Sequence, residues 1–168
     1  MFDKNNFYAA DLYEAINESE DWTKDKDLTD CAYQLIDESR QDEIDKAVSH
    51  LTVEYMHLLK YMCQPYKQSK KWISTIREES RQVRQPISKN TNIAKGVNAK
   101  SMDAYKEALD DAIVETGLPR STFPSVRPSN WTPDEVTDPI FIEKFLKAHQ
   151  ETQEAKRTIY NLYDEGRR

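Results

Sequence analysis

Glycine, cysteine and long apolar runs are all scarce in this sequence of 168 residues. It contains three glycines and two cysteines, while 32% of its residues are charged. Because sheets and their turns use glycine far more often, this composition favours long amphipathic helices. Two cysteines cannot form a dense disulfide framework, and their spacing is not that of a metal cluster. We therefore expect Cys31 and Cys63 to be reduced, small residues of the core.

The sequence also predicts neither a membrane-spanning segment nor a signal peptide. No stretch approaches the roughly 18 consecutive apolar residues of a membrane helix, and residues 1–15 are neither basic nor apolar enough for a signal peptide. The chain does hold 17 aromatic residues, which can anchor a core. The sequence thus predicts a folded cytoplasmic protein without membrane association.

The charge is negative overall and unevenly distributed. The formal net charge is -6, with fourteen acidic against five basic residues in 1–50 and eight basic against two acidic in 60–89. A net negative charge opposes attraction of the whole molecule to nucleic acid, which requires an excess of Lys and Arg. Binding through charge is therefore expected to be local.

One segment has a clear helical rhythm, because apolar residues recur at intervals of three and four and so share one face. Its eight members are Ile44, Ala47, Val48, Leu51, Tyr55, Leu58, Leu59 and Met62. Pro65 denies this helix its next hydrogen bond and is expected to end it. A polar break at residues 38–42 is expected to separate it from a helix starting near Leu28.

The downstream half shows start and stop signals for further helices. Ser69 is a candidate cap for a helix that Pro86 is expected to stop. A further helix is expected from about Asn98, or a few residues earlier, to Thr116, with Gly117 as its left-handed cap. Residues 117–139 hold five of the seven prolines and predict an irregular crossing segment.

The crossing segment leads into a final helix. Phe123 and Trp131 are expected to fix the crossing to the bundle. The residues at 132–135 and 138–139 have the pattern of caps followed by first-turn prolines, and they predict a long C-terminal helix through Tyr163.

Several short blocks of this chain resemble the bacterial family catalogued as domain of unknown function twenty-nine. The blocks are His57-Leu58-Leu59-Lys60-Tyr61, Gln64-Pro65, Ser69 with Trp72, Thr75-Ile76-Arg77, Tyr105, and Glu115 to Leu118. Residues 7–9 and 35–39 match more loosely, so the resemblance covers roughly 1–140. Ala10 replaces a tryptophan usual in the family, and residues 128–132 lack its usual cysteine.

The resemblance implies a helical bundle whose molecular activity is uncharacterised, and it brings no catalytic assignment. Together with the periodicity, it predicts an all-α, compact bundle of four to six helices with a Pro-rich irregular crossing segment. Residues 1–140 form the predicted domain. Residues 141–168 form a predicted helical extension that packs on the bundle or on a partner.

His50, Glu54 and His57 follow one another at spacings of four and three, on one stripe of a helix. Helical bundles present metal ligands in the Glu-x-x-His form, so these three are the candidate metal ligands. The chain lacks a second such motif, and the family usually has an apolar residue where Glu54 stands. The favoured interpretation has no metal and no cofactor, with a partly buried His57 bonded to a neighbouring helix or loop.

Residues 69–85 form a helix with a basic face. Arg77, Arg81 and Arg84 are four and three residues apart, next to Lys70 and Lys71. Such a face can bind phosphates or acidic side chains. The net negative charge and two glutamates in the same helix favour salt bridges within the chain or with a protein partner.

The predicted function is therefore a non-enzymatic interaction module of the antitoxin, inhibitor or adaptor type, which binds a protein partner or a second copy of itself. Its candidate partner-binding residues are Lys70, Lys71, Arg77, Arg81, Arg84, Phe145 and Ile159. One alternative is a metal-binding or hydrolytic bundle enzyme centred on His57, with Arg77 and Tyr105 in the same polar pocket. A second alternative is nucleic-acid binding through residues 69–85. Glycine-rich phosphate loops and nucleophile elbows are absent from the sequence.

Overall fold

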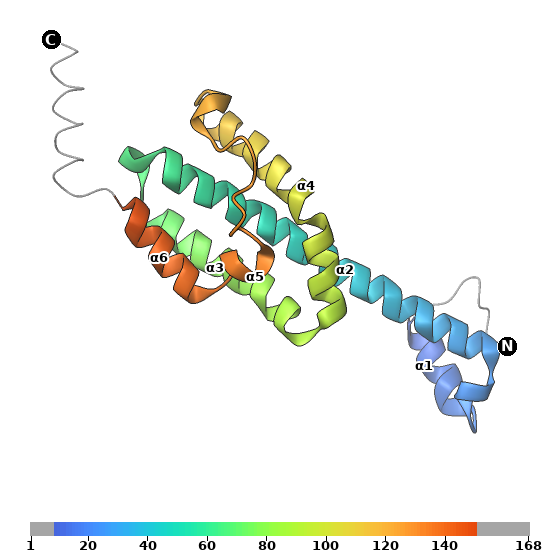
Figure 1. Cartoon of the computed structure of the whole chain (residues 1–168). Coiled ribbons are helices and arrows are strands. Elements are labelled where there is room, and N and C mark those ends of the chain that lie inside the picture. The colour runs from blue at the N-terminus through green and yellow to red at the C-terminus, as the bar shows by residue number, and fades with distance from the viewer. Residues whose placement is uncertain (1–8, 151–168) are drawn as a thin grey trace, which may run out of the picture. The chain divides into compact units, whose positions relative to one another are not determined.

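The computed structural model describes residues 9–150, and these residues are helical without any strand (Figure 1). The α-helices are α1 (Ala9–Glu18), α2 (Lys26–Cys63), α3 (Lys70–Lys89), α4 (Thr91–Thr116), α5 (Pro133–Val136) and α6 (Pro139–His149). Three short 3₁₀ turns join them, namely η1 (Trp22–Lys24), η2 (Pro65–Lys67) and η3 (Arg120–Thr122). The predicted all-α class is confirmed. Over residues 9–150, no helix combines the length and apolarity that membrane crossing requires.

The chain divides into two compact units between Glu43 and Ile44, and α2 contributes residues to each. The polar break expected at residues 38–42 is wrong, because α2 continues through this stretch as one helix. The stretch contains neither proline nor glycine, and its polar side chains are compatible with a helix. Side-chain pairs one turn apart support it, with Arg40 Nη1 2.9 Å from Asp37 Oδ1.

The first unit has a small apolar core between α1 and the start of α2. Leu12, Leu28 and Cys31 are buried there, and Trp22 of η1 packs against them. Asp25 accepts hydrogen bonds from the backbone N–H groups of Asp27 and Leu28 at 3.0 and 3.2 Å. This carboxylate satisfies N–H groups that the first turn of α2 leaves unpaired.

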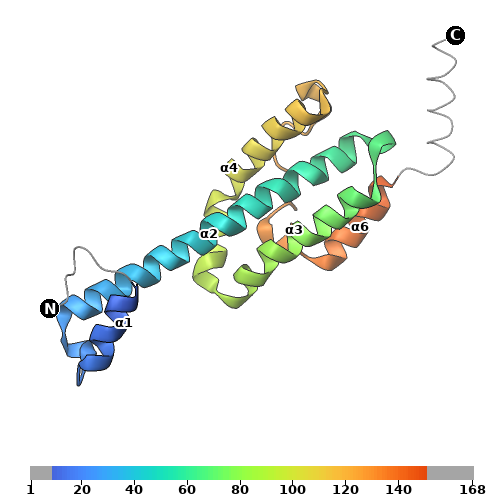
Figure 2. The same ribbon diagram turned by 180° about the vertical axis from the view of Figure 1, so that it is seen from behind.

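The second unit is built around the C-terminal half of α2, which lies between α4 on one side and α3 with α6 on the other (Figures 1 and 2). Six of the eight predicted positions are buried, and Val48 and Met62 are partly buried against them. Gly96 permits α4 to approach closely, because a Cβ atom there would lie 2.4 Å from Ile44 Cδ1. The predicted inner seam is therefore correct.

The helix ends follow the capping rules, with one correction. Ser69 Oγ accepts a hydrogen bond from the Trp72 N–H, and Gly117 adopts the left-handed conformation with φ 66°. Pro86 does not stop α3, which runs on to Lys89. A proline removes one hydrogen bond, and helix packing outweighs that loss here. Asn90 caps α4, which therefore starts before the expected Asn98.

The Pro-rich crossing is fixed to the second unit by aromatic and polar contacts. Phe123 and Trp131 are buried, as predicted. The Trp131 ring stacks on Tyr55 with centroids 6.1 Å apart, and the Tyr55 hydroxyl donates a 2.6 Å hydrogen bond to the Trp131 carbonyl. Arg127 Nη1 donates to Ser101 Oγ at 2.7 Å. The segment thus joins α2 to α4, although its regular structure is limited to η3 and α5.

Tyr55 and Tyr105 provide a matched pair for testing this attachment, because both are buried and their rings are 5.7 Å apart. The Tyr105 hydroxyl has no hydrogen-bond partner among the described residues. We expect Tyr55→Phe to lower the free energy of unfolding by about 1–2 kcal/mol, because it leaves the Trp131 carbonyl unpaired. Tyr105→Phe should leave it unchanged or raise it. Urea unfolding measures both, and equal losses in the two variants would contradict the assignment.

Candidate functional site

Helix α3 has one buried face and one exposed, basic face. Its buried residues are Ile76, Ser80, Val83 and Ile87. The residues between them carry the exposed charges, because a 3.6-residue repeat turns them to the opposite side of the helix. The exposed cations of α3 are Lys70, Lys71, Arg77, Arg81, Arg84 and Lys89.

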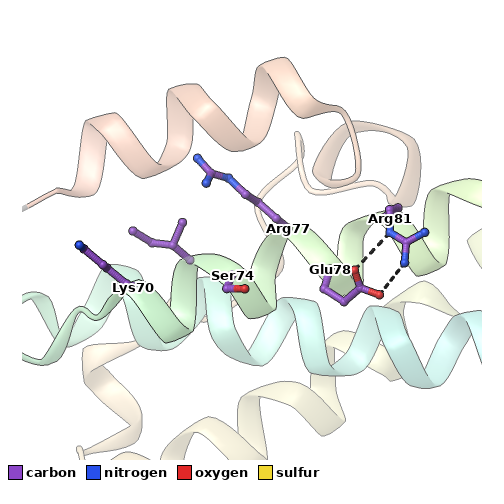
Figure 3. Close-up of a pocket in the computed structure, with 6 residues that line it drawn as sticks. Lys70, Ser74, Arg77, Glu78 and Arg81 are labelled. Carbon is purple, nitrogen blue, oxygen red and sulfur yellow. Dashed lines mark hydrogen bonds and ion pairs between the residues drawn. The ribbon is translucent and has the colours of Figure 1, made fainter.

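A hollow of about 550 Å³ lies along this exposed side (Figure 3). Its lining residues are Lys70, Ile73, Ser74, Arg77, Glu78 and Arg81. Figure 3 shows Arg77 extending toward α6, whereas Arg81 turns to Glu78 on its own helix. The hollow therefore offers both signs of charge around a partly buried isoleucine.

Two of the predicted cations are engaged by acids of the same chain. Arg77 donates from Nη2 and Nε to Glu143 Oε1 of α6, at 2.7 and 3.1 Å. Arg81 Nη2 lies 2.8 Å from Glu78 Oε1, and this hydrogen bond, together with one from Gln82, lowers the pKa of Glu78. The prediction of salt bridges within the chain thus holds for these two arginines.

The other predicted cations on α3 remain available. Lys70, Lys71 and Arg84 are exposed, and none of them forms an ion pair with any residue in the described part of the chain. Exposed, unpaired cations can take acidic partners at little desolvation cost. These three are therefore the free cations among the predicted partner-binding residues.

Phe145, one of the predicted partner-binding residues, belongs to the core in this structure. It is buried in α6, with ring centroids 5.8 Å from Trp131 and 4.4 Å from His149. Its apolar ring is covered because α6 packs on the chain itself, so its side chain offers no free surface. Ile159 lies outside the described residues. The boundary predicted at residue 140 falls inside α6.

The three candidate metal ligands have separate surroundings. His50 Nδ1 lies 2.7 Å from Glu79 Oε2 on α3, and Glu54 is fully buried without a hydrogen-bond partner. His57 Nδ1 lies 2.9 Å from the Val53 carbonyl, so it bonds its own helix and not a neighbouring helix or loop as expected. Burial lowers the pKa of His57. Within residues 9–150, no group of three His, Cys, Asp or Glu side chains is placed to hold a metal ion.

The polar pocket expected for an enzyme does not form from its predicted members. Arg77 pairs with Glu143, His57 bonds the backbone of α2, and Tyr105 packs its ring at 6.2 Å from Trp131. No hydrogen bond or ring contact in the described chain joins any two of these three residues. Their convergence was the observation that would have favoured enzymatic chemistry.

Two polar pairs between helices were missed by sequence reasoning. Lys60 is 8% exposed, pairs with Glu115 and places its ammonium 5.0 Å from the centroid of the Trp72 ring. All three residues belong to blocks that resemble the family, which was the available signal. The pairing of His50 with Glu79 joins residues 29 positions apart, and no sequence signal marks it.

The fold and its surface define an all-α helical protein with a partly unpaired basic face on one helix. The chain belongs to the family described as domain of unknown function DUF29, whose match covers residues 7–142. This confirms the family indicated by the sequence blocks. No curated protein and no solved structure matches the chain.

Both side chains of the ion pair between Arg77 and Glu143 are exposed, Arg77 to 55% and Glu143 to 61%. Because solvent screens such pairs, we expect a double-mutant cycle with Arg77→Ala and Glu143→Ala to give a coupling energy below about 1 kcal/mol. Urea unfolding of the four proteins measures it. A coupling above about 2 kcal/mol would show that the face cannot be altered without disturbing the fold.

Proposed function

We propose that this protein is a non-enzymatic interaction module of the antitoxin, inhibitor or adaptor type, and that α3 binds an acidic surface of a protein partner. One observation carries the proposal. Lys70, Lys71 and Arg84 are exposed on one helix, and the described chain supplies no acid to pair with them. Complementary charge on a partner would steer the encounter and fix its orientation.

The hollow adds a feature that a protein side chain could use. Ile73 is partly buried within it and Ser74 is small and exposed, while the charged residues stand around them. An interface commonly surrounds an apolar centre with polar side chains. A partner segment with an apolar residue flanked by Asp or Glu would match this arrangement.

A protein partner fits the charge distribution better than nucleic acid does. The chain has a formal charge of -6, and Glu78 and Glu79 lie on the same helix as the arginines. Nucleic-acid binding draws its affinity from many phosphate contacts, and here Arg77 and Arg81 are already paired with carboxylates. The three unpaired cations therefore suit a small acidic surface on a protein better than an extended phosphate backbone.

The experiment places a photo-crosslinking amino acid at Ser74 in the full chain, expressed in its own cells. We expect a crosslinked protein adduct. Its yield should fall at least tenfold when Lys70, Lys71 and Arg84 are all replaced by Gln, because the free charges of the face are lost. Mass spectrometry of the adduct identifies the partner, and Asn98 on α4 is the control position for the crosslinker.

A matched control variant separates the face from the overall charge. Lys46, Lys95 and Lys106 are exposed elsewhere, and their replacement by Gln removes the same three charges. This variant should keep the adduct, and the affinity for the purified partner should weaken as salt is raised. Equal loss in both triple variants would contradict the proposal. An adduct that nuclease removes would favour the nucleic-acid alternative.

A further inference from the structure

Glu54 is the one glutamate of the described chain that is completely buried. It lies on α2 with 0% of its surface exposed, and neither of its carboxyl oxygens has a hydrogen-bond partner among residues 9–150. Burying an ionised carboxylate without partners is so unfavourable that the group takes up a proton instead. Burial in the folded chain therefore favours the protonated form of Glu54.

A second carboxylate, that of Glu79 on α3, acts electrostatically on Glu54. Glu79 of α3 is bonded to His50, one turn before Glu54 on α2, at 2.7 Å. Burial and, to a smaller extent, the charge of Glu79 raise the pKa of Glu54 well above its ordinary value of 4.5. The other titratable groups near this point are His57, on which Glu79 also acts, and Tyr55, on which Glu54 acts.

We propose that Glu54, together with Glu79 and His50, forms a proton-binding site between α2 and α3, and that loss of the Glu54 proton opens this contact. An ionised Glu54 would carry a negative charge that Glu79 repels, on a fully buried side chain without a hydrogen-bond donor among residues 9–150. Separation of α2 from α3 would admit water to both groups and relieve the repulsion. This inference does not depend on the proposed interaction partner.

The direction of the pH dependence follows from linkage. Below about pH 4.5, Glu54 is protonated in the folded and the opened chain alike, so it contributes no pH dependence. As the pH rises above this value, the opened chain releases the proton while the folded chain keeps it. The folding equilibrium constant then falls by up to tenfold per pH unit until Glu54 ionises in the folded state as well.

The test compares Glu54→Gln with the natural chain in urea unfolding between pH 5 and about pH 9. The variant keeps the shape and cannot ionise, so its folding constant relative to the natural chain should grow with pH, by up to tenfold per unit. Glu107→Gln on α4, an exposed position, is the matched control and should show no such growth. A ratio for Glu54→Gln that stays constant with pH would overturn the proposal.

A buried glutamine also needs hydrogen bonds, so a second variant and a direct measurement accompany the first. The folding constant of Glu54→Leu relative to the natural chain should rise with pH in the same way, even if altered packing changes the absolute stability of this variant. Carbon-13 NMR of labelled glutamate carboxyl groups should find Glu54 protonated at a pH where Glu107 is ionised. The proposal would be overturned if Glu54 lost its proton over the same pH range as the exposed glutamates.

Amide hydrogen exchange of α2 and α3 measures the opening itself. The natural chain and Glu54→Gln are compared at the same pH, because the intrinsic exchange rate of the amides is then the same in both proteins. Exchange in the natural chain should exceed that of the variant by a factor that increases with pH. Equal exchange at every pH would show that Glu54 does not control the contact. Glu79→Gln should reduce the factor, because it removes the neighbouring charge.

Discussion

The burial of the C-terminal half of α2 is the constraint on which the second unit depends. From Leu51 to Tyr61 every residue of this helix is buried or partly buried, and Leu51, Tyr55, Leu58 and Leu59 have 0% exposure. A helix covered on several sides needs neighbours on each side, and α3, α4 and the Pro-rich crossing provide them. Tyr55 joins two kinds of contact, because its ring stacks on Trp131 while its hydroxyl bonds the Trp131 backbone. The irregular crossing is thus held by the most buried helix.

The second unit also buries polar side chains, and these differ in whether they have a hydrogen-bond partner. Ser80 Oγ donates to the Thr137 carbonyl at 3.2 Å, and Lys60 pairs with Glu115 beside Trp72. Such partners offset the cost of removing polar groups from water. Glu54 has no such partner. A well-packed contact between α2 and α3 therefore contains one group whose protonation state decides whether burial is tolerable.

Helix α3 has two distinct roles because its faces differ. Its inner face packs Ile76 and Val83 on α2 and carries Glu79, which bonds His50. Its outer face carries the free cations Lys70, Lys71 and Arg84, of which Lys70 lines the hollow. The two faces share one rigid helix, so the position of the basic face follows from how the inner face packs. Exposed charges there add little to stability, which leaves them open to selection for binding.

The helices, the inner seam and most caps can be predicted from the amino-acid sequence, because apolar periodicity and cap residues are local properties. Ser69, Gly117 and the Thr132–Glu135 capping box act as their patterns predict. The error at Pro86 arose where packing outweighed a local signal, whereas the error at residues 38–42 came from taking mostly exposed polar side chains, which a helix accommodates, for a break. Only the tertiary structure decided which side chains meet across helices: the pairing of His50 with Glu79, that of Arg77 with Glu143, and the isolation of Glu54. These depend on the rotation and spacing of neighbouring helices, which no local pattern in one chain specifies.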